Sequence, residues 1–199
     1  QISTDFRYAG NTEKSHAQND IISMVNDVVL DSGFSLARNH SYSNQYQGTI
    51  TYKGKLDDRN TLDADFRYSH SDGNNYNYFQ QDVFTSENSI AQQGDFARFN
   101  LNYNFQFSPK INLDLGYGNV YTSNSNEMLS NTFTQKEYRN RFSAYLSYKP
   151  IPSVSAKLGG IVENYRQKNT RNDVDHTSFM PFVNLQYIPS KNFNVVAKY

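Results

Sequence analysis

The chain has 199 residues, of which 37% are hydrophobic and 15% aromatic, and its 19 Lys and Arg residues balance its 19 Asp and Glu residues. This length suffices for one domain, the aromatic content argues against a disordered chain, and the balanced charge does not suggest a nucleic-acid partner. The lack of cysteine excludes disulfides, thiolate zinc sites and cysteine nucleophiles. No apolar run approaches the roughly 20 residues of a transmembrane helix, so a membrane role would require a β-barrel.

Alternation of apolar and polar residues recurs along the chain and predicts about nine β-strands. In the clearest case, residues 97–107 ("ARFNLNYNFQF"), every second residue from Ala97 to Phe107 is apolar and the residues between are Arg, Asn and Gln. Residues 20–30 are open to two interpretations, a short helix or a loop strand. Pro181 falls inside a predicted strand, which predicts a β-bulge there. In chain order, the predicted strands cover residues 2–8, 46–53, 62–69, 97–107, 111–121, 138–148, 154–162, 179–187 and 193–199.

The connections between these strands alternate in length. Short turns with Pro, Asp, Ser or Asn are expected at 55–60, 108–110, 149–153 and 188–192. Long polar loops are expected at 9–40, 71–94, 123–136 and 167–177. This order predicts an up-and-down antiparallel sheet with all long loops at one end, as in outer-membrane barrels. A Greek-key sandwich would not keep it.

The size of the apolar phase and the placement of its aromatic residues fit a membrane barrel. Ten steps of about 3.3 Å from Ala97 to Phe107, tilted by about 40–45°, give a height of roughly 24 Å, against about 25 Å for the apolar band of such barrels. Aromatic residues near both ends of the strands predict two girdles at the membrane interfaces. The expected girdles are Tyr52, Phe107, Tyr148 and Tyr187 near the short turns, and Tyr8, Tyr68, Tyr121 and Tyr138 near the long loops.

Units such as "YNFQFSPKINLDLGYG" and "YLSYKPIPSVSAKLGG" resemble the barrel repeats of TonB-dependent receptors, especially the Bacteroidetes-type outer membrane protein β-barrel family. The resemblance covers nearly the whole chain. It implies an all-β fold, location in the outer membrane of a Gram-negative bacterium, and uptake of a nutrient such as a metal chelate, vitamin or glycan. The implied partners are outer-membrane lipid, the remainder of the barrel, a plug domain, and TonB acting through that plug. A complete barrel would need about twice the strands, so residues 1–199 are expected to be one partial barrel domain from inside a longer protein.

No residue constellation predicts catalysis, a cofactor or a metal site. His16, His40, His70 and His176 lie in or beside the expected loops without metal-ligand spacing. His70 could imitate a triad with Ser69 or Ser71 and Asp72, but sequence neighbours on a strand face opposite sides. "NDVD" at 172–175 lacks the ligand pattern of an EF-hand calcium loop, which favours a polar loop tip.

Two sets of residues leave a binding role open. Residues 71–84 ("SDGNNYNYFQQDVF") place aromatic residues among amides. This suits either a binding role, stacking on a sugar or anchoring a protein partner, or a β-extension above the membrane. The polar phase carries charges that could line a substrate path or form a salt-bridged wall: Asp63, Asp65, Arg67, Arg98, Arg139 and Arg141. No ligand-binding residue is assigned from the sequence.

The alternative function is a secreted all-β binding module, similar to a lectin or adhesin. It predicts a compact monomer with a sealed aromatic core and Greek-key connections. If the barrel hypothesis holds, the isolated chain must cover its apolar face, by self-association or by closure into a smaller barrel or sandwich.

Overall fold

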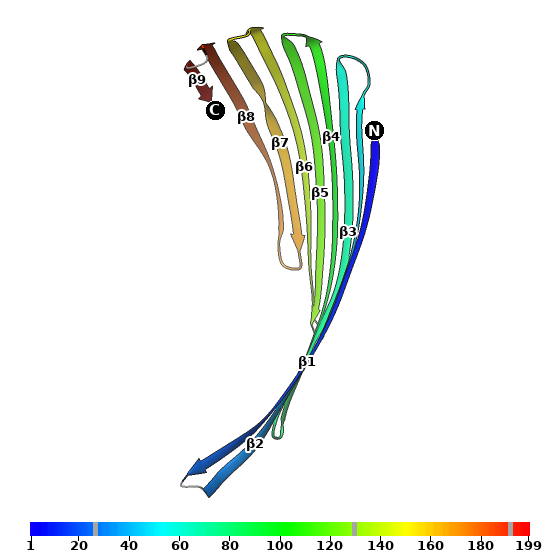
Figure 1. Ribbon diagram of the computed structural model, residues 1–199, viewed down its shortest axis with the longest axis vertical. Helices are drawn as coiled ribbons and strands as arrows, with labels where there is room; N and C mark the ends of the chain where they lie inside the picture. Colours follow the sequence, from blue (N-terminus) through cyan, green and yellow to red (C-terminus); the bar gives the residue numbers. More distant parts are fainter. Residues whose placement is uncertain (26–27, 129–130, 191–192) are drawn as a thin grey trace.

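The protein, described here by a computed structural model over residues 1–25, 28–128, 131–190 and 193–199, is a single curved sheet of nine antiparallel strands (Figure 1). Each strand pairs with the next one in sequence, so the spatial order is the chain order. None of the described residues forms a helix long and apolar enough to cross a membrane. The strands are β1 (Ile2–Val25), β2 (Val28–Lys55), β3 (Asn60–Gln81), β4 (Phe84–Ser108), β5 (Ile111–Met128), β6 (Asn131–Ile151), β7 (Val154–Asn169), β8 (Asp173–Ser190) and β9 (Phe193–Lys198).

The predicted all-β fold, with about nine strands in up-and-down order, is confirmed, but the expected long loops are wrong. Segments 71–81, 84–94 and 131–136 continue the strands into long hairpins, and within 9–40 and 123–136 the described residues are also strand. Residues 20–25 and 28–30 are strand, and positions 26 and 27 lie outside the described residues. Polar residues do not end a strand when a neighbouring strand supplies the backbone partners. Where both faces of a strand contact water, the residues on both faces are polar, and the sequence lacks the alternation of apolar and polar residues that marks a strand.

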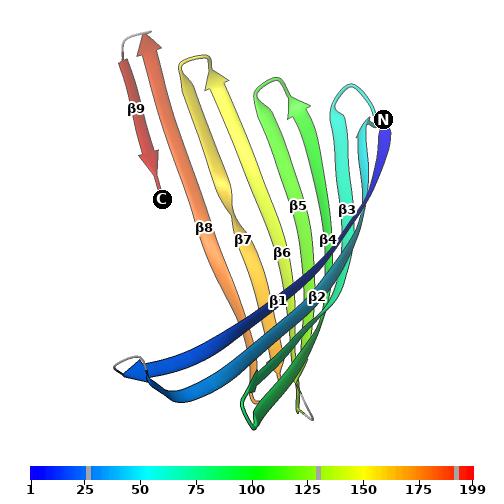
Figure 2. The same cartoon turned by 60° about the horizontal axis from the view of Figure 1, so that its bottom comes forward.

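The short turns gather at one end of the sheet and the long hairpins extend from the other (Figure 2). At residues 56–59, the Asp57 carboxylate accepts hydrogen bonds from the backbone N–H of Arg59 at 2.7 Å and from the Asn60 amide. These bonds hold the pKa of Asp57 below its usual value. Strand β2 has 28 residues, whereas about 9–11 tilted residues suffice to cross a bilayer. Much of the long-hairpin end therefore lies beyond any membrane.

The structure corrects the bulge expected at Pro181. Pro181 pairs with Gly160, and the pairing of β7 with β8 shows no register shift. The neighbouring odd position, Val183, directs both its backbone N–H and its C=O toward Tyr199 at 2.9 Å. Since backbone groups alternate in direction along an antiparallel strand, the nitrogen of Pro181 also points away from β7. The missing N–H is therefore not needed by the ladder with β7.

The sheet is open and its apolar face is not sealed. Among the described residues, β1 and β9 each have one strand neighbour, and Leu36 is the one buried apolar side chain. Large apolar residues stay exposed, for example Ile50 at 52%, Phe142 at 50% and Phe179 at 65%. Closure into a smaller barrel or sandwich, one of the two expected outcomes, is therefore not what this chain adopts. A secreted module with a sealed core is contradicted as well.

Candidate functional site

The register places the apolar phase of every strand on one face. Cross-strand partners share a face, and one such row consists of Ile2, Tyr52, Ala64, Leu101, Tyr117, Phe142, Val162 and Phe179. The predicted girdle residues all lie on this face. Near the long hairpins, Tyr8 packs on Tyr46 with ring centroids 5.0 Å apart, and Tyr121 packs on Tyr138 at 4.9 Å.

The apolar band crosses the strands obliquely, as it does in a tilted barrel. On the side of the long hairpins, the band ends at Tyr46 on β2 and at Phe179 on β8. The residue of β8 in the row of Tyr46 is Asp173, six residues before Phe179. The band thus shifts by six residues over six strand steps. With about 3.3 Å per residue and about 4.8 Å between strands, this corresponds to a tilt of about 35°, within the range of outer-membrane barrels.

The opposite, polar face forms the candidate site, and contacts between its side chains across an intervening strand indicate that it is the concave face of the curved sheet. Side chains on it reach across an intervening strand. Lys157 of β7 contacts Asp114 of β5 at 3.2 Å, and Tyr145 of β6 packs edge-on against Phe182 of β8 at 5.6 Å. Asp114 also accepts a hydrogen bond from Asn112 at 3.1 Å. Neither Lys157 nor Asp114 was singled out from the sequence, because only the register shows that they meet.

All six charged residues predicted to line the lumen lie on this concave face, but they do not form a continuous salt-bridged wall. Asp65 pairs with Arg98 at 3.3 Å. The Arg67 guanidinium lies 5.8 Å from the centroid of the Phe96 ring and donates to Gln47 at 2.7 Å. Arg139 lies over Tyr165 at 5.5 Å. Asp63 and Arg141 form no ion pair with any described residue.

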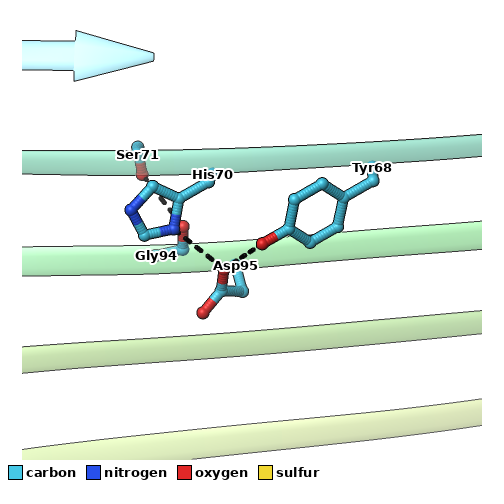
Figure 3. A network of polar contacts seen from close by, with 5 residues as sticks. All are labelled: Tyr68, His70, Ser71, Gly94 and Asp95. Atoms are coloured by element: carbon cyan, nitrogen blue, oxygen red, sulfur yellow. Dashed lines mark hydrogen bonds and ion pairs between the residues drawn. The ribbon is translucent and has the colours of Figure 1, made fainter. Parts of the chain in front are cut away.

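His70 and Ser71 lie on opposite faces of β3, so the triad-like arrangement considered around His70 does not form (Figure 3). His70 Nδ1 lies 2.9 Å from Asp95 Oδ1, and the Tyr68 hydroxyl donates to the same oxygen at 2.7 Å. These three side chains belong to the convex face, beside the girdle. Ser71 lies on the concave face and its hydroxyl donates to the Gly94 carbonyl at 3.4 Å. Sequence spacing did not reveal Asp95, which lies opposite His70 only through the pairing of β3 with β4.

The remaining candidates fall on strands and turns. Asp173 and Asp175 begin β8 and face Lys168 and Arg166, each pair 3.9 Å apart. Among the described parts of the chain, no three His, Asp or Glu residues gather in a way that would hold a metal ion. In segment 71–84, Tyr76 and Tyr78 share the convex face, whereas Asn75 and Asn77 share the concave face. The segment is the β-extension that was one of its two interpretations. Asn74 and Gln80 share the convex face with the two tyrosines, and the Tyr78 hydroxyl donates to Gln80 Oε1 at 3.0 Å.

Comparison with known proteins agrees with this geometry. A model of the outer membrane protein beta-barrel family matches residues 54–199. No curated protein sequence matches the chain significantly. Solved structures show the same fold: BauA, the ferric preacinetobactin receptor from Acinetobacter baumannii (TM-score 0.53, 8% identity), the ferric citrate transporter FecA (0.52, 12%), and the ferric-catecholate import receptor Fiu from K12 E. coli (0.52, 8%).

Each of these matches covers 99% of this chain but only 39%, 38% and 49% of the respective receptor chain. The resemblance to receptor barrels that was inferred from the sequence is confirmed, as is location in the outer membrane. Such receptor and transporter barrels are not enzymes, which agrees with the expectation for this chain. The chain belongs to the outer membrane protein beta-barrel family, and its two-faced sheet is a section of an outer membrane β-barrel.

Proposed function

We propose that this chain is part of the wall of a TonB-dependent receptor that takes up a nutrient, a metal chelate, a vitamin or a glycan. The observation that carries the proposal is the opposition of the two faces. One presents an exposed apolar band with aromatic edges to lipid, and the other presents hydrogen-bonding side chains to a wet interior. A dry core could not hold so many Asp, Arg and Asn side chains without a partner for each.

In this proposal, residues 1–199 are one partial barrel domain. Its partners are outer-membrane lipid on the convex face, the remainder of the barrel at the edges of β1 and β9, and a plug domain within the lumen. TonB would act through that plug. A wall section separated from these partners would self-associate through its apolar face, because apolar surface of this extent is driven out of water.

Nutrient uptake by the native host tests the proposal. Strains with and without the intact gene would be grown with iron chelates, cobalamin or oligosaccharides as the limiting nutrient, each with TonB present or deleted. We expect loss of uptake of one nutrient class on deletion of the gene, and an equal loss on deletion of TonB. Uptake that needs the gene but persists without TonB would instead indicate a passive pore.

A further inference from the structure

The long-hairpin end differs in charge between its two faces. On the convex face, the extended parts of β1 to β4 carry Lys14, His16, Arg38, His40, Asp72, Glu87 and Asp95. On the concave face of the same segments, beyond the row of Arg7 and Gln47, Glu13 is the one charged residue among the side chains described. Hairpins that only remain soluble would carry charge on both faces, so the uncharged concave face calls for a separate explanation.

This concave surface, which we call the mouth surface, consists mainly of amides, hydroxyls and glycines, with a few apolar residues such as Phe79 and Ile90 among them. The rows run across β2 to β6, so that amide and hydroxyl groups from several strands lie side by side. Gly73 and Gly94 leave the surface hollow, and one hollow there has a volume of about 450 Å³. Its lining residues on the concave face include Ser43, Ser71, Gln92, Asn124, Asn126 and Gln135. Asp72 and Gln93 also border the hollow, but the register places their side chains on the convex face.

Most of these groups have not used their hydrogen-bonding capacity within the protein. Ser71 donates to the Gly94 carbonyl and Gln135 donates to Glu137. The side chains of Ser43, Gln92, Asn124 and Asn126 make no hydrogen bond to any other described residue. On the convex face, by contrast, Asn44 bonds Asp72 and Ser89 bonds Asn74. Each free amide offers two donors and an acceptor.

We infer that the mouth surface binds a neutral, polyhydroxylated ligand, an oligosaccharide, before it enters the lumen. Hydroxyl groups need both donors and acceptors, which amides and serines supply together. A charged ligand would need side chains of the opposite charge, and the mouth surface carries almost none. Phe133, at the edge of the hollow, adds an aromatic ring against which the apolar face of a sugar can pack. This inference rests on the proposed uptake function and names its ligand class.

Neighbouring glutamines of β4 provide a matched pair of variants. Gln92 lies on the concave face opposite Gly73, and Gln93 lies on the convex face opposite Asp72. Binding would be measured by fluorescence anisotropy on the purified intact protein in detergent. The probes are fluorescently labelled hexasaccharides of glucose, mannose, galactose and xylose, with a sulfated glucose hexasaccharide as the charged counterpart.

We expect at least one neutral hexasaccharide to bind and the sulfated one to bind no better. Changing Gln92→Ala together with Asn124→Ala should weaken binding at least tenfold, while Gln93→Ala stays within twofold of the parent protein. Preference for the sulfated probe, no binding of any neutral probe, or equal losses for Gln92→Ala and Gln93→Ala would overturn the inference. If the inference fails in this way but the protein still takes up a different nutrient with the help of TonB, the proposed function stands. If the mouth surface binds a sugar but no uptake depends on TonB, the proposed function is wrong and the sugar site stands.

Discussion

Replacing Gly159 by alanine in the intact outer membrane protein should prevent correct pairing of β6 with β7. A Cβ atom at this position would lie 2.0 Å from the backbone carbonyl oxygen of Ala144 and 2.8 Å from Tyr145 Cα. Backbone atoms of a paired strand cannot rotate away as a side chain can. The Tyr145 ring also covers Gly159, since its Cδ1 would lie 2.8 Å from the added Cβ. Overpacking a well-filled site costs about 1–3 kcal/mol, occasionally more, and we expect about 3 kcal/mol or more here.

Two other glycines serve as controls for this prediction. Gly48→Ala adds a Cβ that meets nothing within 4 Å, and we expect a change in unfolding free energy of less than about 0.5 kcal/mol. Gly160→Ala meets the edge of the Phe179 ring at 2.7 Å, which can turn aside, so its effect should be intermediate. Urea unfolding in detergent, followed by heat-modifiable migration on gels, would rank the three variants. Equal stability of Gly159→Ala and Gly48→Ala would contradict the close approach of β6 and β7.

A single arginine should be far more damaging on the convex face than on the concave face of the same strand. Leu101 lies near the middle of the apolar phase of β4, and Asn102 is its neighbour on the concave face. Leu101→Arg places a charge near the midplane of the bilayer, where such a substitution costs about 2–4 kcal/mol. Asn102→Arg places the same charge opposite Asp63 in the wet interior, and we expect a change near zero.

The amount of folded protein in the outer membrane and its urea midpoint would report this difference. The two variants place the same side chain at adjacent positions of one strand, and Asn102→Arg is the one that adds more volume, so a larger loss for Leu101→Arg cannot be due to the added volume. A larger loss for Asn102→Arg would mean that the faces are assigned the wrong way round, and comparable losses would contradict the difference between the two faces.

The sequence predicted the two faces and the strand order because burial against lipid imposes a strict period of two. Ala97 to Phe107 alternate so regularly that a shift of one residue would turn the whole apolar set toward water. The turn residues around Asp57 and Pro109 marked the short connections equally well. Both patterns lie within a single segment, so they can be recognised without knowing which strand pairs with it.

The parts that were missed depend on pairing or on two wet faces. The strands continue through residues 71–81 and 84–94, where both faces contact water and no contrast between apolar and polar residues marks the strand. The Asp95 partner of His70 and the Asp114 partner of Lys157 are 25 and 43 residues away along the chain. The bulge at Pro181 was predicted because the sequence does not show toward which neighbouring strand the missing N–H would point. Each of these features follows from the pairing register of the strands, which cannot be derived from the sequence of any one segment.

The central claim is that the apolar face of the sheet contacts lipid and the polar face lines the barrel interior. Residues 1–199 contain no cysteine. Single cysteines can be introduced at each position from 97 to 107 in a cysteine-free background of the intact protein and spin-labelled in lipid bilayers. Collision with molecular oxygen, which concentrates in lipid, would be measured by electron paramagnetic resonance at each site. We predict high oxygen accessibility at odd positions and low accessibility at even positions from 97 to 107. Uniform accessibility, or high values at Asn100, Asn102 and Asn104, would contradict the claim.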